Sequence, residues 1–289
     1  MNRIYKAYPG GKHKVLTLSY DDGKVQDYRL LELLDKYHIK ATFNLNSAVK
    51  DDIHISQDEW RELYKSHEVA VHTMTHPTMA RCTPYQICEE LLEDKNNLEE
   101  IMQKPVRGLA FPNGSYNDEI INLAKSLGFK YARVAGDKYA NICAAKHFAK
   151  EAEGPILLGD ETGFGIPEDY MHWLPTCHHN HHLVDLAKDF INLTKKQYLY
   201  MMYVWGHSFE FDRNDNWELM EEFCKVISNR DDIWYATNLE IVEYDEAFNN
   251  LQFFARNSYV YNPNAMSVFV MANNDKCIEI PGGATIKLF

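Results

Sequence analysis

The sequence lacks the cysteine pattern of a secreted, disulfide-bonded protein. Its 289 residues include six cysteines, but these form no C-x-x-C pair and no disulfide-framework spacing. A chain of this length can bury a full-sized core without needing disulfides. We therefore interpret the cysteines as free, buried thiols of a reducing compartment. They are Cys82, Cys88, Cys143, Cys177, Cys224 and Cys277.

Long hydrophobic runs are also absent. The longest, Leu199 to Trp205, is much shorter than the ~20 residues that a membrane-spanning helix requires. The first residues of the chain contain neither an apolar segment nor the small-residue cleavage site of a secretory signal. These absences predict a cytoplasmic protein without a membrane partner. The alternative is a secreted protein whose signal peptide has been removed from the chain.

Positive charge is in deficit. The 30 Lys and Arg residues are outnumbered by 42 Asp and Glu residues, which leaves a net charge of −12 with histidine neutral. Such a surface repels a phosphate backbone and anionic lipids, so nucleic acid is not an expected partner. No G-x-G-x-x-G or P-loop pattern surrounds Gly163 and Gly165, so we expect no phosphate cradle in that loop.

What the sequence does contain is an alternation of strand-like and helix-like segments, in a composition typical of soluble globular proteins. Strands separated by helices predict βα units and a mostly parallel sheet. So many units favour a distorted (β/α) barrel of about seven parallel strands, with the active site on the loops after the strands. The expected strands are 14–20, 40–46, 68–72, 106–111, 130–133, 198–205 and 233–237, and the expected helices are 28–37, 58–66, 84–103, 118–127, 183–194 and 217–228.

The last forty residues differ in character from the rest of the chain. Short strand-like segments at 252–256, 267–271, 277–280 and 285–288 are separated by Asn, Pro and Gly turns. We expect one barrel over residues 1–248 and a small β-rich C-terminal extension over residues 249–289. The extension is too short to be stable alone, and its role is left open.

Adjacent carboxylates follow the first predicted strand of the barrel. Asp21 and Asp22 cannot point the same way from an extended backbone, so one can face a metal while the other faces a nucleophilic water. The alternative is a plain surface turn, because Asp and the following Gly23 favour turns.

Two histidines follow the third predicted strand. His72 and His76 are four residues apart, so their imidazoles meet on one face if the segment makes a helical turn. Two histidines and a carboxylate form a three-ligand metal site with an open position for water. An accidental surface pair is the alternative, but a barrel brings the ends of neighbouring strands together, which favours a shared site.

Five short motifs occur in a fixed order along the chain. Ser19–Gly23 matches [TS]-[FY]-D-D-G, and His72–His76 matches H-[ST]-x-x-H. Ala110–Gly114 corresponds to R-P-P-[YFW]-G, Asp169–Trp173 matches D-x-x-x-W, and Trp205–His207 corresponds to L-x-H. With these motifs, residues 10–245 resemble the polysaccharide deacetylases, carbohydrate esterase family four, with their chitooligosaccharide deacetylase homology domain.

The resemblance implies a metal-dependent hydrolase that removes acetyl groups from an N- or O-acetylated sugar or oligosaccharide. It implies that Asp22, His72 and His76 bind one divalent ion, most simply zinc, although this donor set also accepts cobalt, nickel or iron. Asp21 is then the general base, and His207 is the general acid that protonates the departing group.

Supporting roles are implied for residues of the third and fourth motifs. Asp169 would pair with His207, and Trp173 would form an apolar wall for the acyl methyl group. The backbone N–H of Asn113 would help to hold the oxyanion, and Pro112 belongs to the same supporting loop.

Two departures from the family pattern bear on function. Ala110 replaces the arginine that orients the catalytic aspartate, so Arg107 or Arg133 would have to supply the guanidinium. Trp205 replaces a leucine of the acyl pocket and would reshape that pocket. An amidase of the same superfamily, acting on a non-sugar and even cyclic C–N bond, is therefore an alternative. A catalytically silent carbohydrate-binding protein is an alternative of another class.

A second group of histidines lies outside the family motifs. Cys177 to His182 reads C-H-H-N-H-H, and we interpret it as a solvated loop that binds metals adventitiously. The alternative is a loop that faces substrate at the barrel mouth. The sequence leaves open the exact substrate, an amide or an ester bond, the native metal and any homo-oligomer.

Overall fold

A parallel sheet occupies the centre of the molecule. The computed structural model describes residues 3–139 and 163–289, and Cys143 lies outside them. Eight of the described strands form one sheet in the order β6-β5-β4-β3-β2-β8-β7, with β9 paired to β2. Every pairing in this sheet is parallel, which confirms the predicted distorted (β/α) barrel. The strands are β2 (Lys14–Asp21), β3 (Thr42–Leu45), β4 (Glu68–Val71), β5 (Gly108–Ala110), β6 (Tyr131–Arg133), β7 (Cys177–His178), β8 (Tyr200–Gly206) and β9 (Ile233–Tyr235).

The strand that the sequence does not predict, β7, helps to close the barrel. The Trp173 N–H donates to the Ala132 carbonyl of β6 (3.0 Å), and the Thr176 N–H donates to the Tyr203 carbonyl of β8 (2.8 Å). Residues 173–178 therefore join the two edges of the sheet. β7 itself has two residues, too few for an alternating hydrophobic pattern to reveal it.

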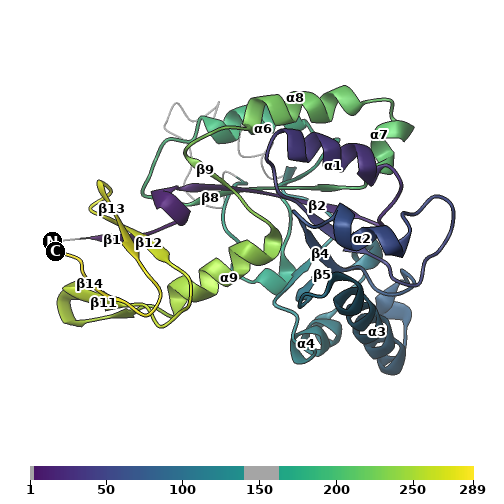
Figure 1. Ribbon diagram of the computed structural model, residues 1–289, viewed down its shortest axis with the longest axis horizontal. Helices are drawn as coiled ribbons and strands as arrows, with labels where there is room; N and C mark the ends of the chain where they lie inside the picture. The colour runs from purple at the N-terminus through teal and green to yellow at the C-terminus, as the bar shows by residue number, and fades with distance from the viewer. Residues whose placement is uncertain (1–2, 140–162) are drawn as a thin grey trace, which may run out of the picture.

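Helices cover the outer face of the barrel, with α1, α6 and α8 along one side and α3 and α4 along another (Figure 1). Leu16, Leu18 and Tyr20 of β2 are completely buried in the core between sheet and helices. None of the helices in the described ranges combines the length and the hydrophobicity that crossing a bilayer requires. The helices are α1 (Asp27–Lys36), α2 (Gln57–Leu63), α3 (Pro84–Met102), α4 (Asp118–Ser126), α6 (Leu183–Ile191), α7 (Phe209–Arg213), α8 (Trp217–Ile227) and α9 (Asn238–Asn249).

The inner face of the barrel is filled by large aromatic side chains. The Trp173 ring packs against the rings of Tyr131 and Tyr203, with centroid separations of 5.7 and 4.8 Å. The same buried cluster includes Ile241 of α9 and Val270 of β12. In the described part of the chain the barrel is therefore a packed core, and we expect chemistry at its mouth.

Two small antiparallel sheets stand at one end of the molecule (Figure 1). One pairs β1, from the N-terminal end of the chain, with β12, and Ile4 lies opposite Ala272. The sequence analysis expects no strand at residues 4–7, because only a partner from the other end of the chain makes this segment a strand. The division at residue 248 stays a prediction. The strands are β1 (Ile4–Ala7), β12 (Val268–Ala272) and β13 (Lys276–Ile280) in one sheet, and β10 (Gln252–Phe253), β11 (Tyr259–Tyr261) and β14 (Thr285–Lys287) in the other.

The cysteines only partly match their expected burial. All five cysteines in the described residues are free thiols. Cys177 and Cys224 are buried, but Cys82 and Cys88 are half-buried and Cys277 is exposed. Expecting every thiol to be buried is wrong for these three, because they lie on or near the surface of a loop, a helix and an edge strand.

Candidate active site and metal centre

Two adjacent carboxylates at the end of β2 face different groups. The buried Asp21 accepts a hydrogen bond at Oδ1 from Asn44 Nδ2 (2.8 Å). Asp22 follows with φ of 79°, which turns the chain out of the strand direction. Its Oδ1 lies 3.7 Å from His72 Nε2 and 3.8 Å from His76 Nε2. Asp22 thus contacts both histidines, whereas Asp21 Oδ2 lies 3.8 Å from His72 Nε2 alone of the pair and has further partners of its own.

The two histidines meet through an irregular turn. The expected helical turn after β4 is absent, because Thr73 and His76 have φ of 66° and 59°. The His76 N–H donates to Thr73 Oγ1 (3.1 Å), which holds the turn closed. The ring centroids of His72 and His76 are 4.8 Å apart. The convergence that the sequence predicts is present, but it is reached by positive φ angles and not by helical spacing.

Asp22, His72 and His76 fit a divalent metal. One ligand atom from each lies within 4.8 Å of the other two. His72 Nδ1 lies 2.8 Å from the Ala110 carbonyl oxygen, which can only accept, so Nδ1 carries the proton and Nε2 keeps its lone pair. Burial lowers the pKa of His72 despite the nearby Asp21 and Asp22, which favours the neutral ligand form. A carboxylate and two imidazoles are the donors that zinc prefers.

Asp21 is held by a buried guanidinium from another strand. Arg133, the last residue of β6, forms an ion pair with Asp21 Oδ2, and both side chains are almost completely buried. Burial by itself raises the pKa of Asp21, but Arg133, His72 and His207 outweigh it and hold the pKa below its ordinary value. Asp21 is therefore ionised at neutral pH and can accept a proton.

His207 lies between two carboxylates. Its Nε2 is 3.9 Å from Asp21 Oδ2, and its Nδ1 is 3.6 Å from Glu210 Oε1. Burial alone lowers the pKa of His207, but Glu210, Asp21 and Asp22 together raise it above its ordinary value. A protonated imidazole beside a deprotonated Asp21 is a pairing that suits an acid and a base in one site.

With this geometry in place, the chain can be compared with known proteins. The family model for polysaccharide deacetylase matches residues 9–132. This part of the chain is similar to the polysaccharide deacetylase family. A chitooligosaccharide deacetylase from Rhizobium leguminosarum bv. phaseoli is 32% identical over 104 residues, which cover 35% of this chain and 44% of that protein. The chain spans about half or less of the curated relatives it matches first, from 37% to 52% of their length.

Solved structures share the fold across most of the chain. A protein from Mycobacterium smegmatis has a TM-score of 0.56 at 16% identity, covering 85% of this chain and 94% of its own. A family 4 acetyl xylan esterase from Clostridium thermocellum, solved with a cobalt ion, has a TM-score of 0.51 at 18% identity. That match covers 80% of this chain and 92% of the esterase. At these identities the likeness concerns the fold alone.

The guanidinium beside Asp21 comes from β6 and not from β5. Ala110 of β5 pairs in register with Arg133 of β6, so Arg133 is next to the position where the family carries its arginine. Arg107 precedes β5 and lies 3.4 Å from Glu243 Oε1 of α9, at the opposite end of the barrel. Of the two candidates from the sequence, only Arg133 reaches the site.

The expected partner of His207 is not Asp169. The Asp169 side chain accepts from the Met171 N–H (2.8 Å) and lies 3.6 Å from Lys125 Nζ. It therefore caps the short helix η5 (Tyr170–His172). The carboxylate beside His207 is that of Glu210, which lies in the first turn of α7, three residues after His207. The i, i+3 spacing of His207 and Glu210 is the signal that could have indicated this.

The aromatic residue at the site is Trp205 and not Trp173. Trp173 is 1% exposed inside the barrel core, so it offers no wall to an acyl group. Trp205 lies at the mouth with its ring 4.6 Å from the Arg133 guanidinium carbon and 4.9 Å from the ring centre of His178. The replacement of leucine by tryptophan in the fifth motif therefore stacks a ring on the arginine that holds Asp21.

The third-motif loop lies after β5 as expected. Pro112 is buried at the start of the short helix η3 (Pro112–Gly114), and Asn113 has φ of 55° within it. The oxyanion role of the Asn113 N–H stays a prediction. Two supporting residues were missed by the sequence analysis, Asn44 on Asp21 and Asp94, whose Oδ2 accepts from the His72 N–H (3.2 Å). Asn44 is a polar residue inside the buried strand β3, and Asp94 is a polar residue on the buried face of α3. Such positions could have indicated both residues.

The histidine-rich segment is a solvated loop only in its second half, where residues 180–182 form an exposed turn. His178 and His179 lie with their Nε2 atoms 3.0 and 3.1 Å from Glu210 Oε2, and His179 is completely buried. These three residues form a second group whose ligand atoms lie within 4.8 Å of one another. His181 and His182 instead stack on Tyr139. β7 makes the difference, because it anchors His178 to the barrel wall.

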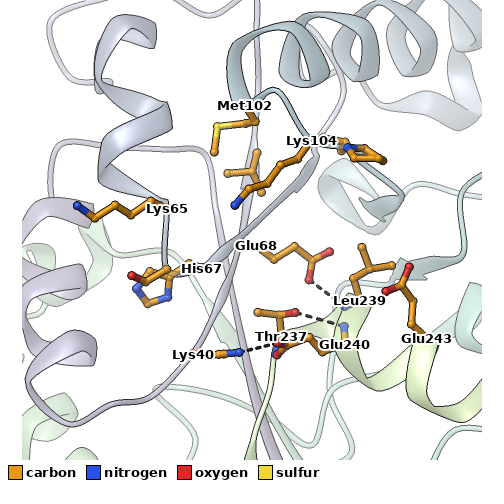
Figure 2. A pocket seen from close by; sticks show the side chains of 14 residues that line it. Lys40, Lys65, His67, Glu68, Met102, Lys104, Thr237, Leu239, Glu240 and Glu243 are labelled. Atoms are coloured by element: carbon orange, nitrogen blue, oxygen red, sulfur yellow. Dashed lines mark hydrogen bonds and ion pairs between the residues drawn. The ribbon is translucent and has the colours of Figure 1, made fainter. Parts of the chain in front are cut away.

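A cavity of about 290 Å³ lies at the other end of the barrel, where strands begin (Figure 2). There Glu68 accepts hydrogen bonds from Thr42 Oγ1 (2.8 Å), Tyr131 Oη (2.7 Å) and the Leu239 N–H (2.9 Å). Burial raises the pKa of Glu68 to about 7. Glu68 thereby joins β3, β4, β6 and the start of α9. In (β/α) barrels this face serves stability, whereas catalysis occupies the opposite face.

Proposed function

We propose that this chain is a metal-dependent hydrolase that removes acetyl groups from an N- or O-acetylated sugar or oligosaccharide. The observation that carries the proposal is the meeting of Asp22, His72 and His76 beside Asp21, a second and separately held carboxylate. The family supports the reaction class, and a relative named chitooligosaccharide deacetylase supports the substrate class. The cytoplasmic location stays a prediction.

The metal would be held by Asp22 Oδ1 and by Nε2 of His72 and His76. A divalent ion, most simply zinc, would supply Lewis-acid polarisation of the acyl carbonyl and would lower the pKa of a water. The hydrogen bond from His72 Nδ1 to the Ala110 carbonyl keeps Nε2 free for this purpose. Asp94 fixes the backbone of His72 from the opposite side.

Asp21 acts as the general base. Its Oδ1 is occupied by Asn44 and its Oδ2 by Arg133, so the carboxylate cannot rotate. Its low pKa keeps it ionised, and it removes the proton from the water that attacks the acyl carbon. The new C–O bond forms on the side of the carbonyl that faces Asp21.

His207 acts as the general acid. Its Nε2 faces the same space as Asp21 Oδ2, and its raised pKa favours the protonated ring. When the C–N or C–O bond of the substrate breaks, His207 Nε2 delivers its proton to the departing nitrogen or oxygen. The products are acetate and a free amine or hydroxyl. The proton that Asp21 removed restores the acid for the next turnover.

A second candidate is an amidase of the same superfamily that acts on a non-sugar C–N bond. The observation that favours it is Trp205, whose ring at the mouth occupies the place of the family's leucine. A bulkier wall would suit a small planar substrate better than an oligosaccharide. The mechanism and the residues would be unchanged, so only a substrate survey separates the two.

The test is acetate release from a panel of N- and O-acetylated mono- and oligosaccharides, with small cyclic and linear amides measured in parallel for loss of substrate. Metal-stripped protein and protein reloaded with zinc or cobalt serve as controls. We expect acetate release that disappears on stripping and returns on reloading. Turnover of the amides alone would favour the second candidate. Sugar binding without any turnover would leave a catalytically silent binding protein.

A further inference from the structure

Glu210 is a carboxylate surrounded by three imidazoles. Its Oε2 lies 3.0 Å from His178 Nε2 and 3.1 Å from His179 Nε2. Its Oε1 lies 3.6 Å from His207 Nδ1 and 2.9 Å from Arg213 Nη2. The side chain is 10% exposed, so the ionised form must be balanced by these donors. The mechanism above uses His207 but leaves the other two histidines unexplained.

We propose that Glu210, clamped by His178 and His179, is the positioning residue that orients His207 for proton delivery to the leaving group. The inference rests on the proposed function, because it names the part of the molecule that prepares its general acid. It also gives a role to the histidine-rich segment that none of the family motifs includes.

The tautomer of His178 shows how the clamp works. The Asn180 N–H donates to His178 Nδ1 (3.2 Å), so Nδ1 carries the lone pair. The proton of the neutral ring is then on Nε2, which lies 3.0 Å from Glu210 Oε2. A metal ion would need the lone pair on Nε2 instead. Although the three ligand atoms are close enough for an ion, this tautomer of His178 disfavours one, and the two imidazoles hold Glu210 by close contact.

His179 gives the clamp a rigid backing. Its ring is completely buried and packs against the rings of Tyr20 (5.8 Å) and Phe211 (4.2 Å). Gly206 leaves room for it, since a Cβ at that position would lie 2.2 Å from His179 Nδ1. Burial lowers the pKa of His179 to about 4, so the ring is neutral, and its Nε2 lies 3.1 Å from Glu210 Oε2. The packed His179 ring thus limits the movement of the carboxylate.

The position of Glu210 selects which nitrogen of His207 faces the substrate. Oε1 lies on the Nδ1 side of the ring and Asp21 Oδ2 on the Nε2 side. With Nδ1–H directed at Glu210, Nε2 is left for the departing group. The Nδ1 separation of 3.6 Å is longer than a hydrogen bond, and contacts of this kind shorten when substrate closes the site.

The test compares Glu210→Gln with Asp212→Asn, a matched change on the same short helix. Asp212 contacts Trp217 and Gln26 and not His207. Two substrates are used: an N-acetylated chitooligosaccharide, whose amine must be protonated to leave, and an aryl acetate, whose phenolate leaves without a proton. For Glu210→Gln we expect kcat on the oligosaccharide to fall about 100-fold with KM nearly unchanged, and the aryl acetate rate to fall less than about 5-fold. Asp212→Asn should leave both rates near those of the unmodified protein.

Three further measurements keep the result interpretable. In a His207→Ala background, Glu210→Gln should cause no further loss, because the residue it positions is gone. His178→Ala, which leaves Glu210 in place but removes one donor, should show a smaller loss of the same kind. In nitrogen NMR spectra of metal-loaded protein, the His207 Nδ1–H signal should weaken in Glu210→Gln and persist in Asp212→Asn. This signal tests the positioning of His207 even if the chain hydrolyses none of the acetylated substrates. A lack of hydrolysis would overturn only the proposed function.

Equal losses on both substrates, or an unchanged His207 signal in Glu210→Gln, would overturn the inference. A second equivalent of metal that disappears in Glu210→Gln and in His178→Ala would also overturn it, since the cluster would then be a metal site. Thermal unfolding of each variant separates these outcomes from a general loss of folded protein.

Discussion

Arg133 at the end of β6 forms a buried ion pair with Asp21 at the end of β2. Three strands separate β6 from β2 in the sheet, so the two residues meet only because the sheet curls into a barrel. The pair holds the proposed base in its ionised form and in one orientation. It also fills the role left vacant by Ala110, from the neighbouring strand.

Replacing Arg133 should therefore impair catalysis far more than replacing Arg107. Arg133→Ala leaves the Asp21 carboxylate buried without its cation, which costs about 3–5 kcal/mol in comparable buried pairs. We expect turnover to fall at least ~100-fold, because Asp21 would protonate or rotate. Arg107→Ala, a matched change at the far end of the barrel, should retain most activity. Similar losses in both variants would contradict the assignment of Arg133.

Metal content should depend on Asp22 and His72 but not on Asp21. Asp22→Ala and His72→Ala each remove one of three ligands, so elemental analysis of the purified variants should find little bound metal. Asp21→Asn keeps the ligand set and should bind metal normally while losing hydrolysis. Full metal occupancy in Asp22→Ala would refute the ligand assignment, and wild-type rates in Asp21→Asn would refute the base.

Gly206 should tolerate no side chain. A methyl group there would overlap His179 Nδ1 at 2.2 Å, and His179 packs against the rings of Tyr20 and Phe211. Overpacking of this kind costs about 1–3 kcal/mol, so Gly206→Ala should lower the melting temperature by roughly 3–10 °C. In a His179→Ser background the same change should cost much less, which assigns the effect to this one contact. An unchanged melting temperature in Gly206→Ala would contradict the packing.

The stability of the fold should fall as pH rises through the range in which Glu68 ionises. Burial raises its pKa from 4.5 to about 7, so between these values the folded state keeps a proton that the unfolded chain has released. The free energy of unfolding therefore decreases from about pH 4.5 to pH 7. Above pH 7 the stabilisation that Glu68 contributes has been lost.

Glu68→Gln should remove that dependence, because the amide resembles the protonated carboxyl. Relative to wild type, the variant should gain roughly 2–3 kcal/mol between pH 4.5 and pH 8, as measured by urea unfolding across that range. Glu218→Gln on the exposed side of α8 is the matched control and should leave the pH profile unchanged. A Glu68→Gln profile parallel to that of wild type would show that Glu68 does not titrate in this window.

Local signals in the sequence were enough to predict most helices and strands of the barrel. They were also enough to predict the proposed metal ligands at the ends of the strands. The fully buried β2 is an apolar, β-branched run, and α3 begins at Thr83 and Pro84 with a capping box. Asp22, His72 and His76 follow their strands directly, so knowing the strands placed the triad. Each of these inferences depends on residues that are near one another in the chain.

The remaining features depend on residues that are far apart in the chain. Whether Arg107 or Arg133 reaches Asp21 is decided by which end of the barrel each occupies. Whether Asp169 or Glu210 accompanies His207 is decided by the packing of η5 against β6 and of α7 against β7. β1 becomes a strand only against β12.

By itself, the amino-acid sequence determined the βα alternation, the resemblance to a known family and the side chains that meet at the barrel mouth. Periodicity, capping and motif spacing act over a few residues and are written directly in the chain. Only the tertiary structure decided the cation for Asp21, the carboxylate for His207 and the place of His178 and His179. The physical reason is that the curl of the sheet and the burial of each charge depend on the packing of the whole barrel.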